Sequence, residues 1–242
     1  MKLCISNLSF KKNIFEDYCN IVKKQNCKRL ELAPSLISIK IEELKKIIKK
    51  KNMKIESIQS VFFKYNSKKY INFMEKNFIE CFKSTALFAK KVSAKNICIG
   101  NCPSRSLNLN SKKMMNSNLK YFKMFLKICN NYKIRLLIEP IHKKFNISFL
   151  NNHLETYKFI SNFNNMFLLF DTGNIKENNE DFFKEFLSYK KKIRHVHFRN
   201  ENKNSIKKKI NFLRKNKYKY SYSIESFENY GKKCLNLLEN IK

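Results

Sequence analysis

Four side chains that can bind a metal or move a proton recur at regular intervals in the second half of the chain. Each lies at or next to the end of a short apolar run, and the spacings from one to the next are 32, 26 and 28 residues. This is about the length of one strand–helix unit. If parallel strands carry these residues, all of them meet at one edge of the sheet. The residues are Glu139, Asp171, His197 and Glu225.

Three carboxylates that converge in this way raise one another's pKa unless a cation lies among them. Two glutamates, an aspartate and a histidine form an oxygen-and-imidazole ligand set. Such a set suits Mn²⁺, Mg²⁺, Co²⁺ or Zn²⁺ and lacks the thiolates of structural zinc sites. We therefore expect one divalent metal ion, with Mn²⁺ as the first choice. A single strand-end glutamate is more often structural, so the prediction depends on the joint spacing of all four.

Four further residues are candidates for binding a substrate. His195 alternates with His197, so both face the same side of a strand, and His195 would lie deeper as a hydrogen-bonding residue. Gln59 ends the third apolar run, and Arg105 follows the fourth, where its planar guanidinium would suit a phosphate. His142 stands in the loop after the fifth run. The ordinary alternatives are a core histidine and polar loop residues.

The elements that must position these residues alternate regularly along the chain. Lysine-rich segments such as 41–50 and 77–92 have the 3–4 apolar spacing of amphipathic helices. They separate eight short apolar runs that we expect to be strands. Eight strand–helix units in 242 residues predict an α/β protein with one (β/α)₈ TIM barrel as a single domain over residues 1–242. The predicted strands are 2–8, 29–33, 54–63, 95–100, 134–139, 166–171, 193–198 and 220–226.

An open, doubly wound sheet is the competing architecture. Its usual signal is a glycine-rich phosphate loop after the first strand. The first apolar run, "KLCISNL", is followed by "SFKKN" and no such loop. The barrel is therefore the better prediction.

The formal net charge of +32 raises the question of a nucleic-acid partner. Only six of the 51 cationic residues are arginine, and the lysines are spread along the chain rather than gathered in one segment. We expect solvated lysine faces without a specific polyanion partner. The charge would still steer anionic substrates toward the protein.

The eight cysteines include no CxxC pair, and the N-terminal segment "MKLCISNLSFKK" lacks the apolar stretch of a signal peptide. No segment has the roughly 18 uncharged apolar residues that a membrane span needs. We therefore expect a cytoplasmic protein with reduced thiols and no membrane partner. Self-association is left open.

A wider set of motifs surrounds the four candidate ligands. They are "ISNLSF" (5–10), "LELAPS" (30–35), "ESIQSVFF" (56–63), "IEP" (138–140), "NISFLNN" (146–152), "DTGN" (171–174), "HVHF" (195–198) and "SIESF" (223–227). Together they resemble the xylose isomerase-like TIM-barrel superfamily. Within it they look most like the sugar phosphate isomerases and epimerases associated with surface-polysaccharide loci.

The resemblance implies a metal-dependent enzyme. Glu139, Asp171, His197 and Glu225 match the family's metal ligands, and the two glutamates match the carboxylates that pass the substrate proton. Two departures affect the neighbourhood but not the ligands. Many relatives carry histidine where Asn174 stands, and the loop "EPIHKKF" lacks the asparagine that often follows its proline.

The chemistry implied by this ligand set is proton transfer next to a carbonyl group. The ion chelates a ketone oxygen and the adjacent hydroxyl of an open-chain sugar, one glutamate removes the proton between them to give an enediolate, and the other returns a proton. Return to the same carbon epimerises the sugar, and return to the neighbouring carbon isomerises it.

Two alternatives remain beside this reading. An apurinic endonuclease of the same barrel type would explain the positive charge, but it needs several metals held by many histidines, and the chain has four. A degenerate barrel that only binds a partner is the second alternative.

Overall fold

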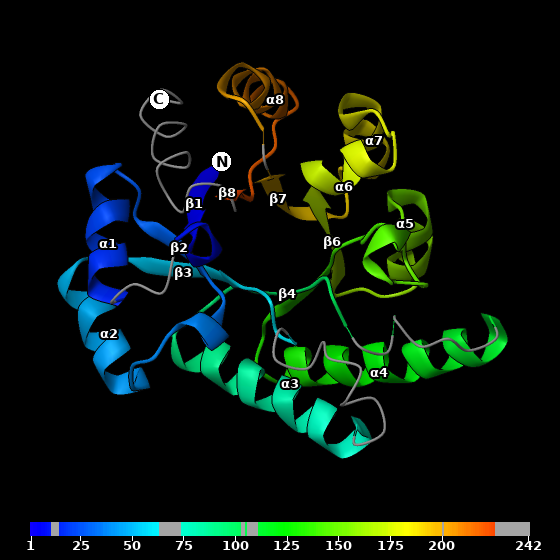
Figure 1. The fold of residues 1–242 in the computed structure, drawn as a ribbon, viewed down its shortest axis with the longest axis horizontal. Helices are drawn as coiled ribbons and strands as arrows, with labels where there is room; N and C mark the ends of the chain where they lie inside the picture. Colours follow the sequence, from blue (N-terminus) through cyan, green and yellow to red (C-terminus); the bar gives the residue numbers. More distant parts are fainter. Residues whose placement is uncertain (11–14, 63–73, 103–104, 106–110, 200, 226–242) are drawn as a thin grey trace.

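The computed structural model describes residues 1–10, 15–62, 74–102, 105, 111–199 and 201–225. Eight parallel strands form a closed barrel in the order β1 to β8, and helices surround it (Figure 1). The predicted (β/α)₈ TIM barrel is confirmed. The strands are β1 (Lys2–Ser6), β2 (Arg29–Leu32), β3 (Lys54–Ile58), β4 (Asn96–Ile99), β5 (Arg135–Ile138), β6 (Met166–Asp171), β7 (Ile193–Arg199) and β8 (Ser221–Glu225). The helices are α1 (Phe15–Lys24), α2 (Ile41–Lys50), α3 (Met74–Lys91), α4 (Ser111–Asn131), α5 (His153–Ser161), α6 (Thr172–Glu177), α7 (Phe182–Tyr189) and α8 (Lys203–Lys215).

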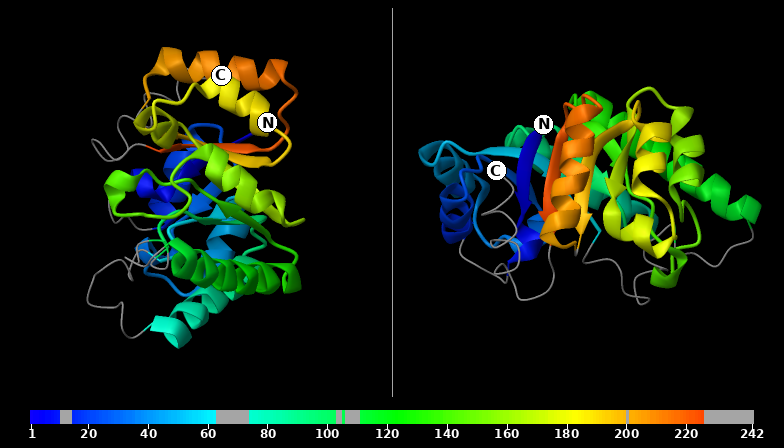
Figure 2. Two further views of the ribbon diagram at one scale, coloured as in Figure 1. Left: turned by 90° about the vertical axis from the view of Figure 1, so that its right-hand side faces the viewer. Right: turned by 90° about the horizontal axis from the view of Figure 1, so that it is seen from above.

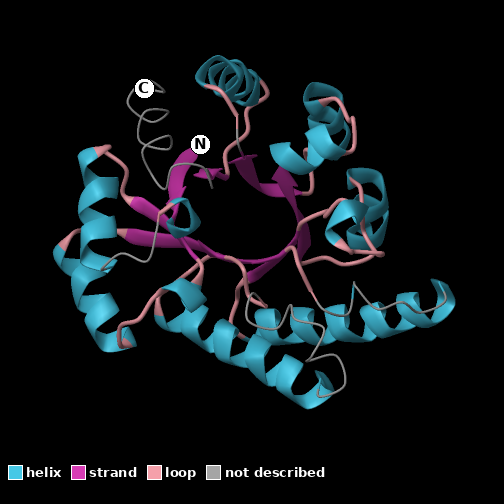
Figure 3. Ribbon diagram, in the orientation of Figure 1, coloured by secondary structure: helices cyan, strands magenta, loops and turns pink. Residues whose placement is uncertain are grey.

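The barrel closes by pairing of its first and last strands. Residues 2–5 of β1 pair in parallel with residues 221–224 of β8. The ring of strands in Figure 3 is therefore continuous, and the side views in Figure 2 show the helices packed around it. Because every strand runs in the same direction, all the carboxyl ends open at one mouth.

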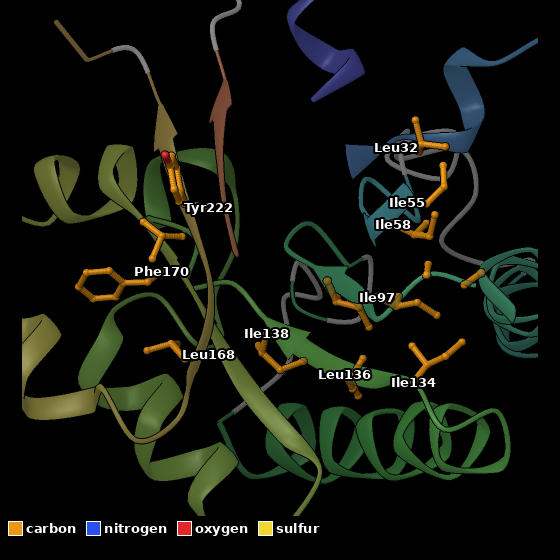
Figure 4. Close-up of a cluster of buried hydrophobic side chains, with 14 of the residues drawn as sticks. Leu32, Ile55, Ile58, Ile97, Ile134, Leu136, Ile138, Leu168, Phe170 and Tyr222 are labelled. Atoms are coloured by element: carbon orange, nitrogen blue, oxygen red, sulfur yellow. The ribbon is translucent and has the colours of Figure 1, made fainter. Parts of the chain in front are cut away.

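Alternation along each strand divides the side chains between two cores. Outward-facing residues such as Leu168 and Phe170 of β6 pack against the helices in the main apolar core (Figure 4). A separate, smaller cluster of Cys98, Leu137 and Leu169 is formed by the alternate, inward-facing positions. Polar side chains at the next inward positions lie above this small cluster, at the carboxyl ends of the strands. The alternation of side chains along each strand thus places the candidate site residues at the carboxyl-terminal mouth of the barrel.

Several strands end earlier than the apolar pattern predicts, and β3 and β5 are the two that bear on the site. The pattern predicts a strand over 54–63, but β3 ends at Ile58. Ser60 has a φ of 54°, a left-handed backbone conformation that cannot continue a strand. Similarly β5 ends at Ile138, so Glu139 is the first residue of the following loop. Among the helices that the structure describes, none has the length and apolar character needed to span a bilayer.

Candidate functional site

The four predicted ligands lie together at the carboxyl-terminal mouth of the barrel. Glu139 directly follows β5, Asp171 ends β6, His197 lies on β7 and Glu225 ends β8. One donor atom each from Glu139, Asp171 and His197 lies within 4.8 Å of the other two. Glu225 joins them through its Oε2 atom, which is 3.5 Å from His197 Nδ1. Three carboxylates and an imidazole therefore share one small volume.

Two carboxylate oxygens in this cluster are buried without a hydrogen-bond partner in the described part of the chain. They are Asp171 Oδ2 and Glu225 Oε1. A buried anionic oxygen without a partner is costly. A cation would satisfy both atoms, and a set of three carboxylates with one imidazole suits a divalent ion. The residues present therefore fit a metal centre.

Asn174 holds two of the four side chains in place. Its backbone N–H donates to Asp171 Oδ1 over 2.7 Å, and its side-chain Nδ2 donates to Glu139 Oε1 over 2.9 Å. The first bond is the N-cap of α6, so the turn "DTGN" both starts that helix and fixes Asp171. An asparagine at this position thus orients the carboxylates rather than adding another imidazole to them.

Behind the mouth, Glu31 orients His197. Glu31 lies on β2 and is fully buried, and its carboxylate lies 3.1 Å from His197 Nε2. Since a carboxylate accepts hydrogen bonds, Nε2 carries the proton, and Nδ1 is left to face Glu225. Ser223 Oγ donates a further hydrogen bond to Glu31 over 2.5 Å. An outer carboxylate of this kind fixes the orientation of a metal-binding histidine.

His195 occupies the deeper position expected for it and makes hydrogen bonds inside the barrel. The side chain is fully buried. Its Nδ1 atom lies 2.6 Å from Ser221 Oγ, and its Nε2 atom lies 3.2 Å from Glu31 Oε1. Both ring nitrogens are thus engaged inside the barrel, and the predicted contact with substrate stays a prediction.

Glu31, His195 and His197 form a second group whose atoms are close enough to hold a metal ion. These residues already satisfy one another through hydrogen bonds. The unpaired oxygens lie instead on Asp171 and Glu225. We therefore place the candidate metal centre at the mouth and assign the Glu31 group a supporting role.

Burial and mutual charge shift the acid–base behaviour of the cluster. Burial, followed by repulsion from Asp171, raises the pKa of Glu139 to about 7. Burial also raises the pKa of Glu225. For His197, burial acts downward, but Glu225 and Glu31 outweigh it and raise the pKa to about 10. Burial raises the pKa of Glu31, but attraction to His197 and His195 holds it well below its ordinary value. A metal ion would therefore displace protons from this site.

Gln59 lies beside the cluster. Its Nε2 atom donates to Ser6 Oγ over 2.6 Å, and its side chain hydrogen-bonds Glu225, which moderates the pKa of that carboxyl. The side chain is only 5% exposed. Its location is compatible with the predicted substrate contact, which stays a prediction.

Arg105 is predicted to bind a substrate hydroxyl or phosphate, and in the structure its guanidinium is engaged by the backbone instead. The residue is fully buried. Its guanidinium donates to backbone carbonyls of Phe149 over 2.9 Å, Leu150 over 2.6 Å and Glu139 over 2.9 Å, and also to that of Gly100. Burial lowers its pKa to about 10. Arg105 therefore joins the loops that follow β4 and β5 and supports the backbone of Glu139.

His142 lies in the loop after β5 and is half-buried. Its Nδ1 atom accepts the backbone N–H of Lys144 over 3.2 Å and so caps the short 3₁₀ helix η6 (Lys143–Phe145). Its predicted contact with substrate stays a prediction.

Sequence reasoning missed the two close approaches that shape the mouth. A Cβ atom on Gly100 would lie 2.3 Å from Glu139 Oε2, so a glycine is needed for that carboxylate to lie where it does. A Cβ atom on Gly173 would lie 2.1 Å from Arg199 Nε. Arg199 was missed as well, although it stands two residues after His197 and so faces the same side of β7.

Comparison with known proteins assigns the chain to a well-populated fold. The profile of the family described as xylose isomerase-like TIM barrel matches residues 19–236. No protein with curated function matches the chain by sequence.

Proteins of known structure that share this fold are named for different reactions. A 3-keto-D-glucoside 4-epimerase from E. coli has a TM-score of 0.77 and 13% identity, over 100% of this chain and 98% of that one. A family 2 AP endonuclease from Brucella melitensis has a TM-score of 0.79 and 14% identity, over 98% and 97%. L-ribulose 3-epimerase has a TM-score of 0.76 and 15% identity, over 100% and 92%. At such identities the similarity establishes the fold alone.

Proposed function

The chain belongs to the xylose isomerase-like TIM barrel family, and we propose that it is a metal-dependent isomerase or epimerase of a sugar or sugar phosphate. The observation that supports the proposal is the cluster of three carboxylates around His197, two of whose buried oxygens have no hydrogen-bond partner among the described residues. The resemblance of its motifs points to surface-polysaccharide sugar metabolism and to Mn²⁺ as the ion.

The proposed ligands are Glu139, Asp171, His197 and Glu225. A divalent ion bound there would act as a Lewis acid that polarises the substrate carbonyl and acidifies the neighbouring C–H. The chain itself orients the ligands, since Asn174 fixes two of the carboxylates. The small apolar cluster beneath the mouth, Cys98, Leu137 and Leu169, closes the barrel on its inner side.

Glu139 and Glu225 are the proposed proton-transfer groups. Glu139 directly follows β5 and Glu225 ends β8. Because β6 and β7 separate these strands around the ring, the two carboxylates approach a central substrate from different sides. The pKa of Glu139, about 7, suits a group that must both take and release a proton near neutrality. One glutamate would remove the proton from the carbon next to the carbonyl, and the other would return it. This arrangement serves epimerisation directly and isomerisation if the proton returns to the neighbouring carbon.

The structural neighbours include a protein named as an AP endonuclease. DNA cleavage by the multi-metal mechanism would need more imidazoles than this mouth holds. Of the four histidines in the chain, His142 caps η6 and His153 pairs with Glu180, away from the cluster. The geometry therefore favours the sugar enzyme.

Proton exchange in D₂O tests the proposal. Purified protein with Mn²⁺ is incubated with ketoses, aldoses and their phosphates, and C–H exchange is followed by NMR. We expect deuterium to enter at the carbon next to the carbonyl, and Glu139→Gln and Glu225→Gln to abolish the exchange. Glu42→Gln, an exposed position on α2, is the matched control and should exchange at the rate of the unaltered protein.

The same preparation is assayed on abasic DNA. Cleavage of the DNA without sugar exchange would replace the proposal with a repair nuclease. Inactivity in both assays would indicate a barrel that only binds a partner.

A further inference from the structure

Arg199 is a cation at the candidate metal centre that the family motifs do not account for. It ends β7, two residues after His197, and its Nη2 atom lies 2.9 Å from Asp171 Oδ1. Its backbone N–H donates to Thr172 Oγ1 over 3.0 Å. The guanidinium is thus held against the turn that carries one of the proposed ligands.

Gly173 is required for this arrangement. A Cβ atom there would lie 2.1 Å from Nε, 2.6 Å from Nη2 and 2.7 Å from Cζ of Arg199. The glycine therefore leaves the space that the guanidinium occupies beside the turn between Asp171 and Asn174. The chain has only three glycines. Two of them, Gly100 and Gly173, make room for a charged side chain at the mouth.

The guanidinium has donors left over. Among the residues that the structure describes, Asp171 is its one side-chain partner, and the Arg199 side chain is still 18% exposed. An arginine guanidinium stays protonated in proteins, so the group is charged. A planar guanidinium with free N–H groups is suited to a planar or tetrahedral oxyanion.

A cavity of about 370 Å³ opens beside Arg199, between α6, α7 and the start of α8. Its acidic lining residues are already engaged: Glu180 pairs with His153, Glu201 pairs with Lys209, and Asp181 caps α7. Positive charge from Arg199 and from Lys176, another lining residue, is therefore available to a ligand.

The charges of the site do not oppose an anion. Three carboxylates, a divalent ion and Arg199 sum to zero, so a metal-loaded mouth would carry no net charge that repels a phosphate group. Lys176 adds positive charge at the cavity beside it. We propose that Arg199 binds a phosphate group of the substrate at the edge of this cavity next to Asp171, so that the substrate is a sugar phosphate. This inference rests on the proposed function, because it uses the same mouth.

Binding of inorganic phosphate tests the proposal without any turnover. The full chain, loaded with Mn²⁺ and freed of excess metal, is titrated with inorganic phosphate by calorimetry. We expect saturable binding that Arg199→Gln weakens at least tenfold and Arg199→Lys weakens less. Gly173→Ala should also weaken it, because it displaces the guanidinium without removing it. Arg214→Gln, an exposed position on α8 with the same change of charge, is the control and should bind like the unaltered protein.

A second readout separates phosphate binding from mere neutralisation of Asp171. The Mn²⁺ affinity of Arg199→Gln, measured by electron paramagnetic resonance, should equal or exceed that of the unaltered protein, because one competitor for Asp171 is gone. Unchanged phosphate binding in Arg199→Gln, no phosphate binding by the unaltered protein, or a fall in Mn²⁺ affinity would each overturn the proposal.

Phosphate binding and catalysis can fail separately. If no sugar exchanges deuterium but phosphate binding depends on Arg199, the proposed isomerase activity is wrong and the phosphate site stands. If an unphosphorylated sugar is turned over with the same KM by Arg199→Gln, the phosphate site is wrong and the isomerase stands.

Discussion

Buried carboxylates are paired with cations at the amino-terminal mouth of the barrel but are partly unpaired at the carboxyl-terminal mouth. At the amino ends of the strands, Glu56 is almost fully buried, and its carboxylate lies 2.8 Å from Arg29 Nη1 and 3.9 Å from Lys2 Nζ. At the carboxyl ends, Asp171 and Glu225 each keep one buried oxygen without a partner among the described residues.

The amino-terminal mouth also pairs its cations with aromatic rings. The guanidinium of Arg194 lies 4.3 Å from the ring centroids of both Phe167 and Tyr220. Charges at this mouth satisfy one another, as expected for a face that serves stability. The carboxyl-terminal mouth gives up part of that stability and leaves donor atoms for a ligand. The comparison teaches that unpaired carboxylate oxygens, rather than charge itself, mark the site.

The largest effect should come from neutralising one carboxylate at each mouth. Asp171→Asn keeps the shape but removes a proposed ligand, and Mn²⁺ affinity should fall by more than the roughly 100-fold typical of losing an outer partner. Glu56→Gln should leave Mn²⁺ affinity unchanged and lower the free energy of unfolding by about 1–2 kcal/mol, since its partner Arg29 is partly solvated. Calorimetric titration measures the Mn²⁺ affinity of each variant, and urea unfolding measures its free energy of unfolding. Equal metal affinity in both variants would remove the distinction between the mouths.

A larger residue at position 100 should lower the rate of catalysis more than the stability of the fold. In Gly100→Ala the new Cβ atom would meet Glu139 Oε2, the flexible end of a side chain, so the carboxylate can swing away. A displacement of about 1 Å in a catalytic group can lower its rate about 100-fold. We expect a loss of that order in the rate of deuterium exchange, with a small change in the melting temperature. Exchange at the unaltered rate would contradict the assigned position of Glu139.

Removing the support of His197 should have an intermediate effect. Glu31→Gln replaces the acceptor that holds His197 Nε2, and metal affinity should fall by about 10–100-fold. Its matched control is again Glu56→Gln, a buried carboxylate of similar burial at the opposite mouth. If both substitutions change only the melting temperature, Glu31 serves the fold and not the metal.

The metal affinity should also depend on pH. Glu139, with a pKa of about 7, and His197, with a pKa of about 10, hold protons in the metal-free molecule that the ion must displace. Mn²⁺ affinity should therefore rise with pH by about tenfold per unit for each proton displaced. Because the pKa of Glu139 is raised on folding, its contribution to the stability of the metal-free protein is present at low pH and is lost as pH rises through about 7. Titrations between pH 6 and 8 in two buffers count the protons released, and a pH-independent affinity would count against this linkage.

Local patterns were enough to predict the barrel and the four residues at its mouth. The period-2 runs locate each strand, and the strand ends locate the ligand candidates. The pattern failed where backbone geometry intervenes, as at Ser60, which ends β3 early. It also did not reveal the shift of register between β2 and β3, where Glu56 is skipped between the pairs Leu30 with Ile55 and Glu31 with Ser57.

The partners of the site residues were beyond local patterns. Glu31 meets His197 across 166 residues of sequence, and Arg105 is enclosed by carbonyls from the loop after β5. The polarity of Arg105 predicted an available side chain, whereas the fold surrounds it completely. Such contacts depend on how loops return to the barrel, which no spacing rule encodes.

The most direct test of the account is a crystal structure grown with Mn²⁺ and examined by anomalous scattering. The account predicts one ion at the carboxyl-terminal mouth, bound by His197 Nδ1 and by the carboxylates of Glu139, Asp171 and Glu225. An ion held only by Glu31 and the two histidines behind the mouth, or no ion in the barrel at saturating Mn²⁺, would contradict it.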